Sequence, residues 1–558
     1  MRIKTLSSQE KVFLDAELSD YPETGRLSAL RGERVSFQVA FEGDPVPSRS
    51  ARAYATIALS GDLAPLAQVR NVKNVPVEHP VFLEKTDDNY LRKTPGLYPD
   101  LLLPMSCVGA DAPHGKVRLA PRLLRALWVD LRIPEDYPAG EHSVTVSFVR
   151  DDGETVFATF AVEVIPAALP KQELLFTHWF HCDALAQYYR VPVWSDEHFR
   201  LIGNFARTAR ENGVNMLLVP TFTPPLDTAI GGERLTTQLV SVRREGGEYV
   251  FGFDLLDRYL DTIRSAGIEY YEIAHLYSQW GAEHAPKILA EENGEQKRIF
   301  GWETDAHGEE YTRFLRAFLQ AFLAHMRARG EDKKCFFHFS DEPQPAQIDR
   351  YRRCKEAVGN LLAGYPVMDA LSDFSFYEQG VVQTPIPSSD HIGPFLAAGV
   401  PGLWTYYCCG QSVGVSNRLI AMPSWRTRAL GMQMFCHNVV GFLQWGYNFY
   451  NNCYSYDAIN PYSDLSGEFW VPAGDTFSVY PAPNGEALES LRLLVFCEGI
   501  ADLRAMRLCE LLCGREATVR AIEEAYGGPI VFDDCPRTGA QMLRVRETVN
   551  RMIAAACS

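Results

Sequence analysis

The sequence predicts a multidomain protein with an N-terminal antiparallel β-sandwich, a central (β/α)8 barrel and a C-terminal helical segment. The first part of the chain consists of short segments in which apolar and polar residues alternate. The next part alternates strand-like runs with amphipathic helical stretches, and the last part repeats apolar residues every three or four positions. We therefore place the β-sandwich at residues 1–169, the barrel at 170–482 and the helical region at 483–558.

The predicted sandwich contains segments with a period of two residues, which is typical of strands with one buried face. These segments are Val35–Phe41, Ala51–Leu59, Leu127–Ile133, Ser143–Phe148 and Val156–Val164. Two prolines in the run from Ile165 to Pro170 indicate a stiff linker, which we take as the domain boundary.

Eight apolar runs alternate with helical patterns after this linker, which is typical of a parallel barrel. The predicted strands are Leu174–Phe180, Val214–Pro220, Ile268–Leu276, Cys335–Ser340, Tyr365–Leu371, Val381–Thr384, Gly402–Tyr407 and Val439–Trp445. The predicted helices are 196–212, Asp254–Ser265, 309–329 and 345–362, and a hairpin at 239–253 turns at Gly246–Gly247. After the fifth and sixth predicted strands we expect short helices only.

The C-terminal segment has apolar residues at helical spacing. Leu493, Phe496, Ile500, Leu503 and Met506 recur every three or four positions, and further helices are expected at 516–526 and 539–555. We expect these helices to pack on the outside of the barrel.

Composition indicates a globular protein whose partner is not a polyanion. Hydrophobic residues make up 46% of the 558 residues, and the net charge is -16, which disfavours nucleic acid as a partner. We expect a neutral or cationic substrate and no membrane insertion. Because the start lacks a secretory signal, we expect a cytoplasmic location unless an export signal was removed. The sequence leaves monomer and homodimer open.

The thirteen cysteines have no paired spacing typical of a zinc site. They extend from Cys107 to Cys557, and we expect mostly buried, reduced thiols, including the adjacent pair Cys408 and Cys409.

The run Cys335 to Pro343 suggests chemistry, because a strand-length apolar segment ends in two adjacent acids, Asp341 and Glu342. Two carboxyls in a partly buried cleft do not both ionise readily, so one is expected to keep a proton near neutral pH while the other carries charge. Glycoside hydrolysis requires such an acid and such an anion. The same residue types also cap helices, so the run by itself leaves capping and catalysis open.

Aromatic and hydrogen-bonding side chains follow the other predicted strands. They are His178, Trp179, His181, Asp183, His275, Tyr277, Trp280, Trp404, Tyr406, Tyr407, Trp445, Tyr447 and Asn448. Sugar C–H faces stack on aromatic rings and sugar hydroxyls need directional partners, so this set predicts a sugar pocket, although each residue could also serve packing.

Other catalytic classes lack their motifs in this sequence. It has no His-Glu-x-x-His helix motif, no Gly-rich phosphate loop in a strand-loop-helix context and no Gly-x-Ser-x-Gly elbow. We therefore expect no metal at the active site and no cofactor.

Several motifs together resemble glycoside hydrolase family 123, whose characterised members are β-N-acetylgalactosaminidases. The resemblance covers most of the chain and rests on 338–343 (His-Phe-Ser-Asp-Glu-Pro), 442–448, 474–481, 98–104, 134–140, 179–181 and 404–406. The chain departs from the family at 497–502, where a basic residue usually precedes Gly-x-x-Asp and this chain has Glu498.

The resemblance implies substrate-assisted retention, in which the 2-acetamido oxygen of the sugar attacks its own anomeric carbon. Glu342 would protonate the glycosidic oxygen and later deprotonate water, and Asp341 would accept the acetamide N–H and stabilise the oxazolinium intermediate. By strand position, Tyr406 and Tyr447 are candidates to contact the acetamide oxygen, and Trp404 and Trp445 to stack on the sugar. The other predicted substrate-binding residues are His178, Trp179, His181, His275, Trp280 and Asn448.

Two alternatives remain open from the sequence. A glycosidase of another sugar specificity would use a conventional nucleophile, for which Asp369 and Asp373 are the best candidates. A degenerate barrel would bind carbohydrate without turnover.

Overall fold

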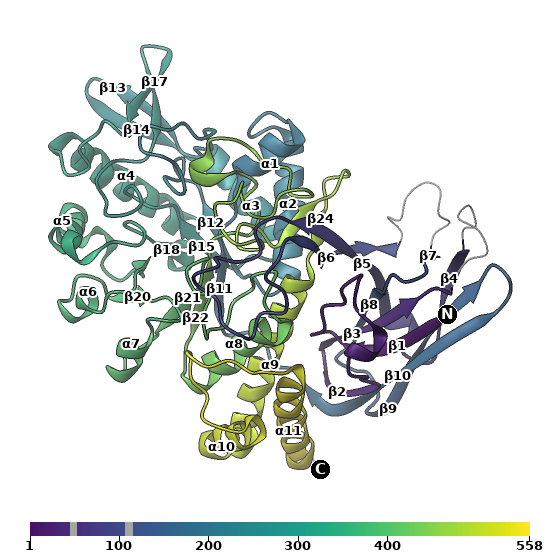
Figure 1. The fold of residues 1–558 in the computed structure, drawn as a ribbon. Helices are drawn as coiled ribbons and strands as arrows, with labels where there is room; N and C mark the ends of the chain where they lie inside the picture. Colours follow the sequence, from purple (N-terminus) through teal and green to yellow (C-terminus); the bar gives the residue numbers. More distant parts are fainter. Residues whose placement is uncertain (45–52, 106–114, 558) are drawn as a thin grey trace.

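The computed structural model describes residues 1–44, 53–105 and 115–557. Residues 51 and 52 of the second predicted strand, and Cys107, lie outside this part of the chain. The chain forms an elongated molecule, with a β-sandwich at one end and a larger α/β part at the other (Figure 1).

The N-terminal part consists of two five-stranded sheets. The first has the order β1 (Arg2–Ser7), β3 (Arg34–Glu42), β8 (Arg125–Arg132), β5 (Ala67–Val77) and β6 (Gly96–Pro104). The second has the order β2 (Arg26–Arg31), β10 (Thr155–Ala168), β9 (Gly140–Arg150), β4 (Ala53–Ser60) and β7 (Lys116–Leu119). The apolar members of the alternating pattern meet between the sheets, where the rings of Phe37 and Phe160 stack 4.0 Å apart.

Two features of the sandwich differ from the prediction. The pair β2 and β10 is parallel, so the sheets are not purely antiparallel. The strand β10 continues to Ala168 through a register shift, so most of the predicted linker is strand that pairs with β2. Pro166 is tolerated because it lies at this irregularity.

Seven of the eight predicted barrel strands contain an observed strand, whereas the predicted strand Val381–Thr384 meets its observed strand only at Thr384. All eight observed strands are short and parallel. Six of them form a sheet in the order β18 (Cys335–Phe337), β15 (Tyr270–Ile273), β12 (Met216–Val219), β11 (Leu175–His178), β22 (Gly441–Gln444) and β21 (Trp404–Tyr406). The other two, β19 (Met368–Ala370) and β20 (Thr384–Ile386), pair with each other. Single parallel bridges join Phe337 to Val367 and Ser388 to Tyr406.

Helices connect these strands. They are α1 (Cys182–Tyr189), α2 (Asp196–Glu211), α3 (Asp254–Ser265), α4 (Glu309–Ala328), α5 (Ile348–Val358), α6 (Ser375–Glu378), α7 (Gly393–Ala397) and α8 (Ser424–Cys436). The predicted hairpin is β13 (Ser241–Glu245) and β14 (Glu248–Gly252), and it joins an unpredicted hairpin of β16 (Ile288–Glu292) and β17 (Glu295–Phe300). The predicted helix 345–362 is divided, because 3-10 turns at Pro345–Gln347 and Gly359–Leu362 flank α5.

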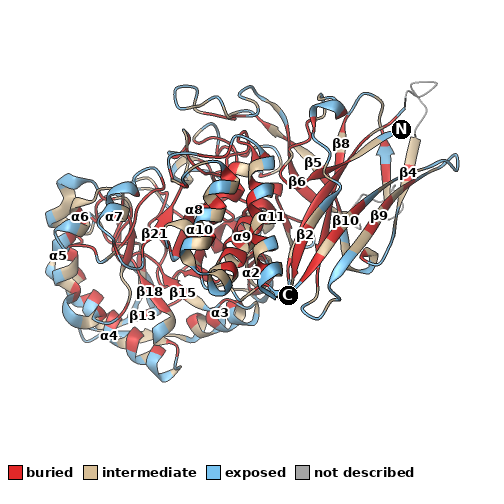
Figure 2. Cartoon of the chain, turned by 90° about the horizontal axis from the view of Figure 1, so that it is seen from below, coloured by how far each residue is buried: buried red, intermediate tan, exposed pale blue. Residues whose placement is uncertain are grey.

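The C-terminal helices α9 (Leu491–Cys513), α10 (Arg515–Tyr526) and α11 (Gly539–Cys557) do more than cover the outside of the α/β part. Helix α9 packs closely on α8, since a Cβ on Gly431 would meet the carbonyl oxygen of Gly499 at 1.9 Å. Helix α11 packs against α9 and against β2 and β10 of the sandwich (Figure 2). The helices therefore join the two parts of the molecule.

Buried ion pairs reinforce this junction. Arg492 of α9 binds Asp100 of β6 at 2.8 Å, and Arg546 of α11 binds Glu33 at 2.7 Å. Glu498, where the chain departs from the family pattern, pairs with Arg428 at 2.9 Å.

In the described ranges no helix combines the length and the apolar character needed to span a bilayer.

Candidate active site

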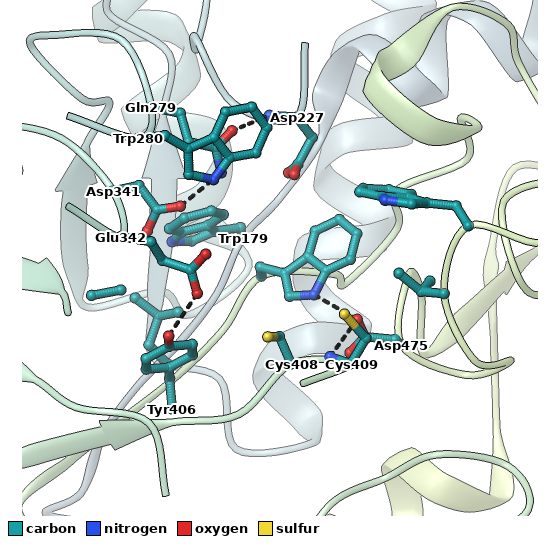
Figure 3. Close-up of a pocket in the computed structure, with 15 residues that line it drawn as sticks. Trp179, Asp227, Gln279, Trp280, Asp341, Glu342, Tyr406, Cys408, Cys409 and Asp475 are labelled. Atoms are coloured by element: carbon teal, nitrogen blue, oxygen red, sulfur yellow. Dashed lines mark hydrogen bonds between the residues drawn. The ribbon is translucent and has the colours of Figure 1, made fainter. Parts of the chain in front are cut away.

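A pocket opens at the carboxyl ends of the parallel strands, and we call it the strand-end pocket (Figure 3). Its lining residues are Trp179, Asp227, Gln279, Trp280, Asp341, Glu342, Ala370, Tyr406, Cys408, Cys409, Leu443, Trp445, Trp470, Val471 and Asp475. The space amounts to about 560 Å³ including the open solvent at its entrance.

Asp341 and Glu342 both line this pocket, four and five residues after the end of β18. They do not cap the following helix, because Gln344 occupies the N-cap position of the 3-10 turn and α5 begins at Ile348. Glu342 adopts a left-handed backbone conformation with φ of 44°, and its N–H donates to the carbonyl oxygen of Ala370 at 2.9 Å. A strained backbone held in this way is typical of functional residues.

The two carboxyls have different surroundings. Tyr406 Oη donates to Glu342 Oε1 at 2.6 Å, and Gln279 Nε2 donates to Asp341 Oδ2 at 2.7 Å. Burial raises the pKa of Asp341 well above its usual value, and the nearby charge of Glu342 raises it further. The raised pKa favours a protonated Asp341, whereas the resemblance assigns the proton-donor role to Glu342.

Asp227, a third carboxyl, faces the pair across the pocket. Its backbone N–H donates to Gln279 Oε1 at 2.6 Å, so Gln279 connects the backbone of Asp227 to the side chain of Asp341. Burial raises the pKa of Asp227 to about 7, and the charge of Glu342 contributes, while Arg234 opposes the shift. Asp227 Oδ2 is buried and has no hydrogen-bond partner among the described residues.

Asp475, a fourth carboxyl, lies beside Trp445. Its Oδ2 accepts hydrogen bonds from Trp445 Nε1 at 3.0 Å and from the Cys409 N–H at 2.9 Å. Burial raises the pKa of Asp475 to about 6, although Arg418 opposes the shift. The pocket thus presents four carboxyl groups, which favours a neutral, hydroxyl-rich ligand over an anion.

Tryptophan side chains form the apolar surface of the pocket. Trp179, Trp280, Trp445 and Trp470 line it, and the Trp445 and Trp470 rings contact each other with centroids 5.7 Å apart. Trp179 Nε1 donates to the buried Glu272 at 2.8 Å, which fixes the orientation of its ring. These rings offer stacking surfaces for the C–H faces of a sugar.

A buried polar cluster lies beneath Trp179. His338 Nε2 is 2.6 Å from Glu272 Oε1, and His338 Nδ1 is 3.4 Å from Asp369 Oδ1. Burial opposes a charge on His338, but its interactions with Asp369 and Glu272 outweigh burial and raise its pKa to about 9. His275 stacks on His338 with centroids 4.4 Å apart.

His275, His338 and Asp369 lie close enough together to be considered as metal ligands. The two imidazole planes differ by only 21° and are stacked, so their in-plane lone pairs do not converge on one point. Together with the ion pairs of His338, this arrangement fits a charged histidine between carboxylates better than a metal centre.

Six of the predicted site residues line the pocket and six do not. Asp341, Glu342, Trp179, Trp280, Tyr406 and Trp445 line it. His178, His181, His275, Trp404, Tyr447 and Asn448 are buried outside the lining.

Four of these six side chains form hydrogen bonds with other groups of the protein. His178 contacts Gln444 and Arg418, and His181 contacts Trp445 and Arg234. Tyr447 donates to the carbonyl oxygen of Phe205, and Asn448 pairs with the backbone of His181. The structure thus places these side chains in support of the strand ends rather than in the ligand space.

The structure differs from the expectation that Cys408 and Cys409 are buried. Cys408 and Cys409 are partly exposed and line the pocket. A hydrogen bond with Cys409 and burial of the sulfur raise the pKa of Cys408 well above its usual value, so its thiol is neutral at physiological pH.

Sequence reasoning did not select Asp227, Gln279, Trp470 or Asp475 as site residues. Asp475 belongs to a motif used for the resemblance, and Gln279 lies one residue before a selected tryptophan, Trp280, so both had a signal. Asp227 lies eight residues beyond β12 and Trp470 in a long irregular segment, where strand position gives no guidance.

Comparison with known proteins places the site in context. Residues 179–509, more than half of the chain, match the model described as the glycoside hydrolase 123 catalytic domain. A solved structure of a family 123 glycoside hydrolase from Clostridium perfringens, reported for glycolipid glycan hydrolysis, matches 100% of this chain and 98% of its own, with a TM-score of 0.73 and 14% identity.

Two further solved structures are too dissimilar to bear on the fold. A family 5 xyloglucanase from Bacteroides ovatus has a TM-score of 0.28 at 8% identity, covering 85% of this chain and 98% of its own. A family 5 mannosidase from Rhizomucor miehei has a TM-score of 0.32 at 11% identity, covering 60% and 94%. None of the curated proteins compared with the sequence matches it.

Proposed function

Because the chain belongs to glycoside hydrolase family 123, we propose that it removes terminal β-linked N-acetylgalactosamine from glycans or glycolipids by substrate-assisted retention. The observation that carries this proposal is the pair Asp341 and Glu342, side by side in the lining of the strand-end pocket. Each acid has its own hydrogen-bond donor, Gln279 or Tyr406, so the two can take separate roles.

In the proposed reaction Asp341 accepts the N–H of the 2-acetamido group and turns the amide oxygen toward the anomeric carbon. A carboxylate accepts this hydrogen bond best when it is ionised, so substrate binding shifts the shared proton from Asp341 to Glu342. Glu342 then protonates the glycosidic oxygen as that bond breaks, and the amide oxygen forms the oxazolinium ring. The ionised Glu342 afterwards deprotonates the water that opens this ring.

The other pocket residues have roles in binding. We assign Trp179, Trp280 and Trp445 to stacking, and the acceptor groups of Asp227 and Asp475 to the sugar hydroxyls. Tyr406 holds Glu342 in place and lies where it can also contact the acetamide oxygen.

We also propose that the eight strands close into a (β/α)8 barrel. The bridges Phe337–Val367 and Ser388–Tyr406 support closure, because they connect the pair β19 and β20 to both edges of the six-stranded sheet. A closed barrel accounts for the gathering of all strand ends at one pocket.

The conventional-nucleophile alternative finds less support in the geometry. Asp369 lies against His338 outside the pocket lining, and Asp373 Oδ1 accepts hydrogen bonds from Ser375. A conventional carboxylate nucleophile would have to lie within the ligand space, close to the general acid.

The test is hydrolysis of nitrophenyl β-N-acetylgalactosaminide by the wild type and by Glu342→Gln, with the gluco epimer as a second substrate. We expect turnover of the galacto substrate and a loss of about 10² to 10⁴ in kcat for the variant. Full activity of Glu342→Gln would exclude its role, and faster turnover of the gluco epimer would change the assigned sugar.

A further inference from the structure

A strip of aromatic side chains leads from the strand-end pocket to the protein surface. We call Trp470, Trp280, Tyr454 and Tyr456 the aromatic strip. Trp280 and Trp470 line the pocket, and both contact Tyr454, with ring centroids 5.8 Å and 6.4 Å apart. Tyr454 in turn contacts Tyr456 at 6.4 Å.

Exposure increases outward along this strip. The exposed fraction is 37% for Trp280, 39% for Tyr454 and 68% for Tyr456. Large aromatic side chains usually bury most of their surface, so a row that is increasingly exposed and begins inside a ligand pocket points to ligand contact rather than to core packing.

The backbone beneath the strip is strained. Trp280, Tyr454 and Ser455 have φ of 58°, 57° and 57°, a region that bulky residues rarely adopt. Asp227 and Glu342, inside the pocket, have φ of 46° and 44°. Strain of this kind gathers at ligand-binding sites, where the surrounding structure maintains it.

Hydrogen bonds fasten the strip to the catalytic residues. The Trp280 N–H donates to the carbonyl oxygen of Asp341 at 2.9 Å. Ser455 Oγ donates to the carbonyl oxygen of Asp227 at 2.8 Å, and the Ala229 N–H donates to the carbonyl oxygen of Tyr454 at 3.3 Å. The rings are therefore positioned relative to the carboxyls of the pocket, as a subsite continuous with it requires.

We propose that the aromatic strip binds the aglycone, and that this aglycone is a further sugar residue of a glycan. This inference rests on the proposed function, which places the terminal sugar in the pocket and the bond to be cleaved at its mouth. The rings of Trp280 and Tyr454, and those of Tyr454 and Tyr456, pack edge to face. Exposed aromatic faces match the C–H faces of pyranoses, and the two tyrosine hydroxyls can bond to sugar hydroxyls. A leaving group of this kind gains binding energy that a simple alkyl aglycone does not.

The test compares kcat/KM for a β-N-acetylgalactosaminyl trisaccharide, for methyl β-N-acetylgalactosaminide and for the decyl glycoside. The variants are Tyr456→Ala and Tyr454→Asn, the latter because asparagine tolerates the left-handed backbone. Phe157→Ala is the matched control, since Phe157 is 64% exposed on the sandwich strand β10, outside the pocket lining.

We expect each strip variant to lower kcat/KM for the trisaccharide roughly three- to tenfold and to leave the methyl glycoside within about twofold. The control should change neither value. Equal losses on trisaccharide and methyl glycoside, or no loss on either, would overturn the proposal, and a loss confined to the decyl glycoside would overturn it in favour of an acyl-binding surface.

Failure of the proposed function would look different, because the wild type itself would hydrolyse none of the three glycosides. Calorimetric binding of the trisaccharide to Glu342→Gln, with and without Tyr456→Ala, then tests the strip independently of turnover. Equal affinity of the two proteins would count against the strip.

Discussion

The hydroxyl of Tyr406 donates a 2.6 Å hydrogen bond to Oε1 of Glu342. Tyr406 is the last residue of β21, and Glu342 follows β18, so two strands that do not pair with each other contribute to one contact. The bond fixes one oxygen of Glu342, which leaves Oε2 as the oxygen available to a leaving group.

Loss of this hydroxyl should affect catalysis more than folding. We expect Tyr406→Phe to lower kcat about 10- to 100-fold, because Glu342 loses a hydrogen bond to its charged form and the geometry of proton transfer loosens. Steady-state kinetics with nitrophenyl and trisaccharide substrates measure the effect. The control is Tyr407→Phe, because Tyr407 is the neighbouring residue, is buried and does not line the pocket. An equal loss of kcat in this control would argue against a specific role of the Tyr406 hydroxyl.

The proposed role of Asp341 predicts a selective loss of affinity for an oxazolinium mimic. Asp341→Asn should bind a galacto-configured thiazoline at least about tenfold more weakly than the wild type, because the amide cannot stabilise the developing positive charge. Calorimetry gives the affinities, with N-acetylgalactosamine as the comparison ligand. A parallel decline for both ligands would indicate a general binding defect.

The raised pKa of Asp227 predicts that the stability of the protein depends on pH. This pKa rises from 3.8 to about 7 on folding, so the native state binds the proton more tightly and stability falls as pH rises through this interval. Asp227→Asn removes this contribution, and its free energy of unfolding relative to the wild type should increase by about 2 to 4 kcal/mol between pH 4 and pH 8.

Urea unfolding across this pH range measures the difference. The exposed Asp349→Asn on α5 is the control and should give a nearly constant difference from the wild type. A constant difference for Asp227→Asn as well would mean that Asp227 ionises normally in the folded protein.

The buried pair of Asp100 and Arg492 should be essential for the junction between sandwich and helices. Asp100 accepts from Arg492 at 2.8 Å and from Tyr480 Oη at 2.5 Å, and Arg492 also binds the carbonyl oxygen of Gly474, next to the pocket residue Asp475. Asp100→Asn leaves a buried charge unpaired, so we expect a loss of about 3 to 5 kcal/mol in unfolding free energy.

A matched control is Glu163→Gln, which breaks the exposed pair with Arg26 and should cost less than about 1 kcal/mol. Chemical denaturation measures both variants. If they lose equal stability, the buried pair is not central to the junction.

Much of the fold could be predicted because it follows from local patterns. Seven of the eight predicted strands contain an observed strand, and the helix 254–265 was predicted with its observed ends. Segments whose neighbours decide their state were predicted less well. The run after Ile165 continues as strand because β2 pairs with it, and β16 and β17 were missed because one charged, exposed hairpin strand resembles a loop.

The candidate site was likewise predicted only in part. Trp179 and His178 are adjacent, yet Trp179 lines the pocket and His178 contacts Arg418 outside it. Successive side chains of an extended chain point to opposite faces, so membership of the pocket depends on register within the folded sheet and not on nearness to a strand end.

The sequence by itself determined the order of strands and helices, the acid pair after the fourth parallel strand and the likeness to glycoside hydrolase family 123. These features are encoded by periodicity and by short contiguous motifs. Tertiary structure alone decided that Asp227, Gln279 and Asp475 share a pocket with Asp341 and Glu342, and that Asp341 has the raised pKa. Burial and the fields of neighbouring charges arise only when segments that lie far apart in the chain are brought together.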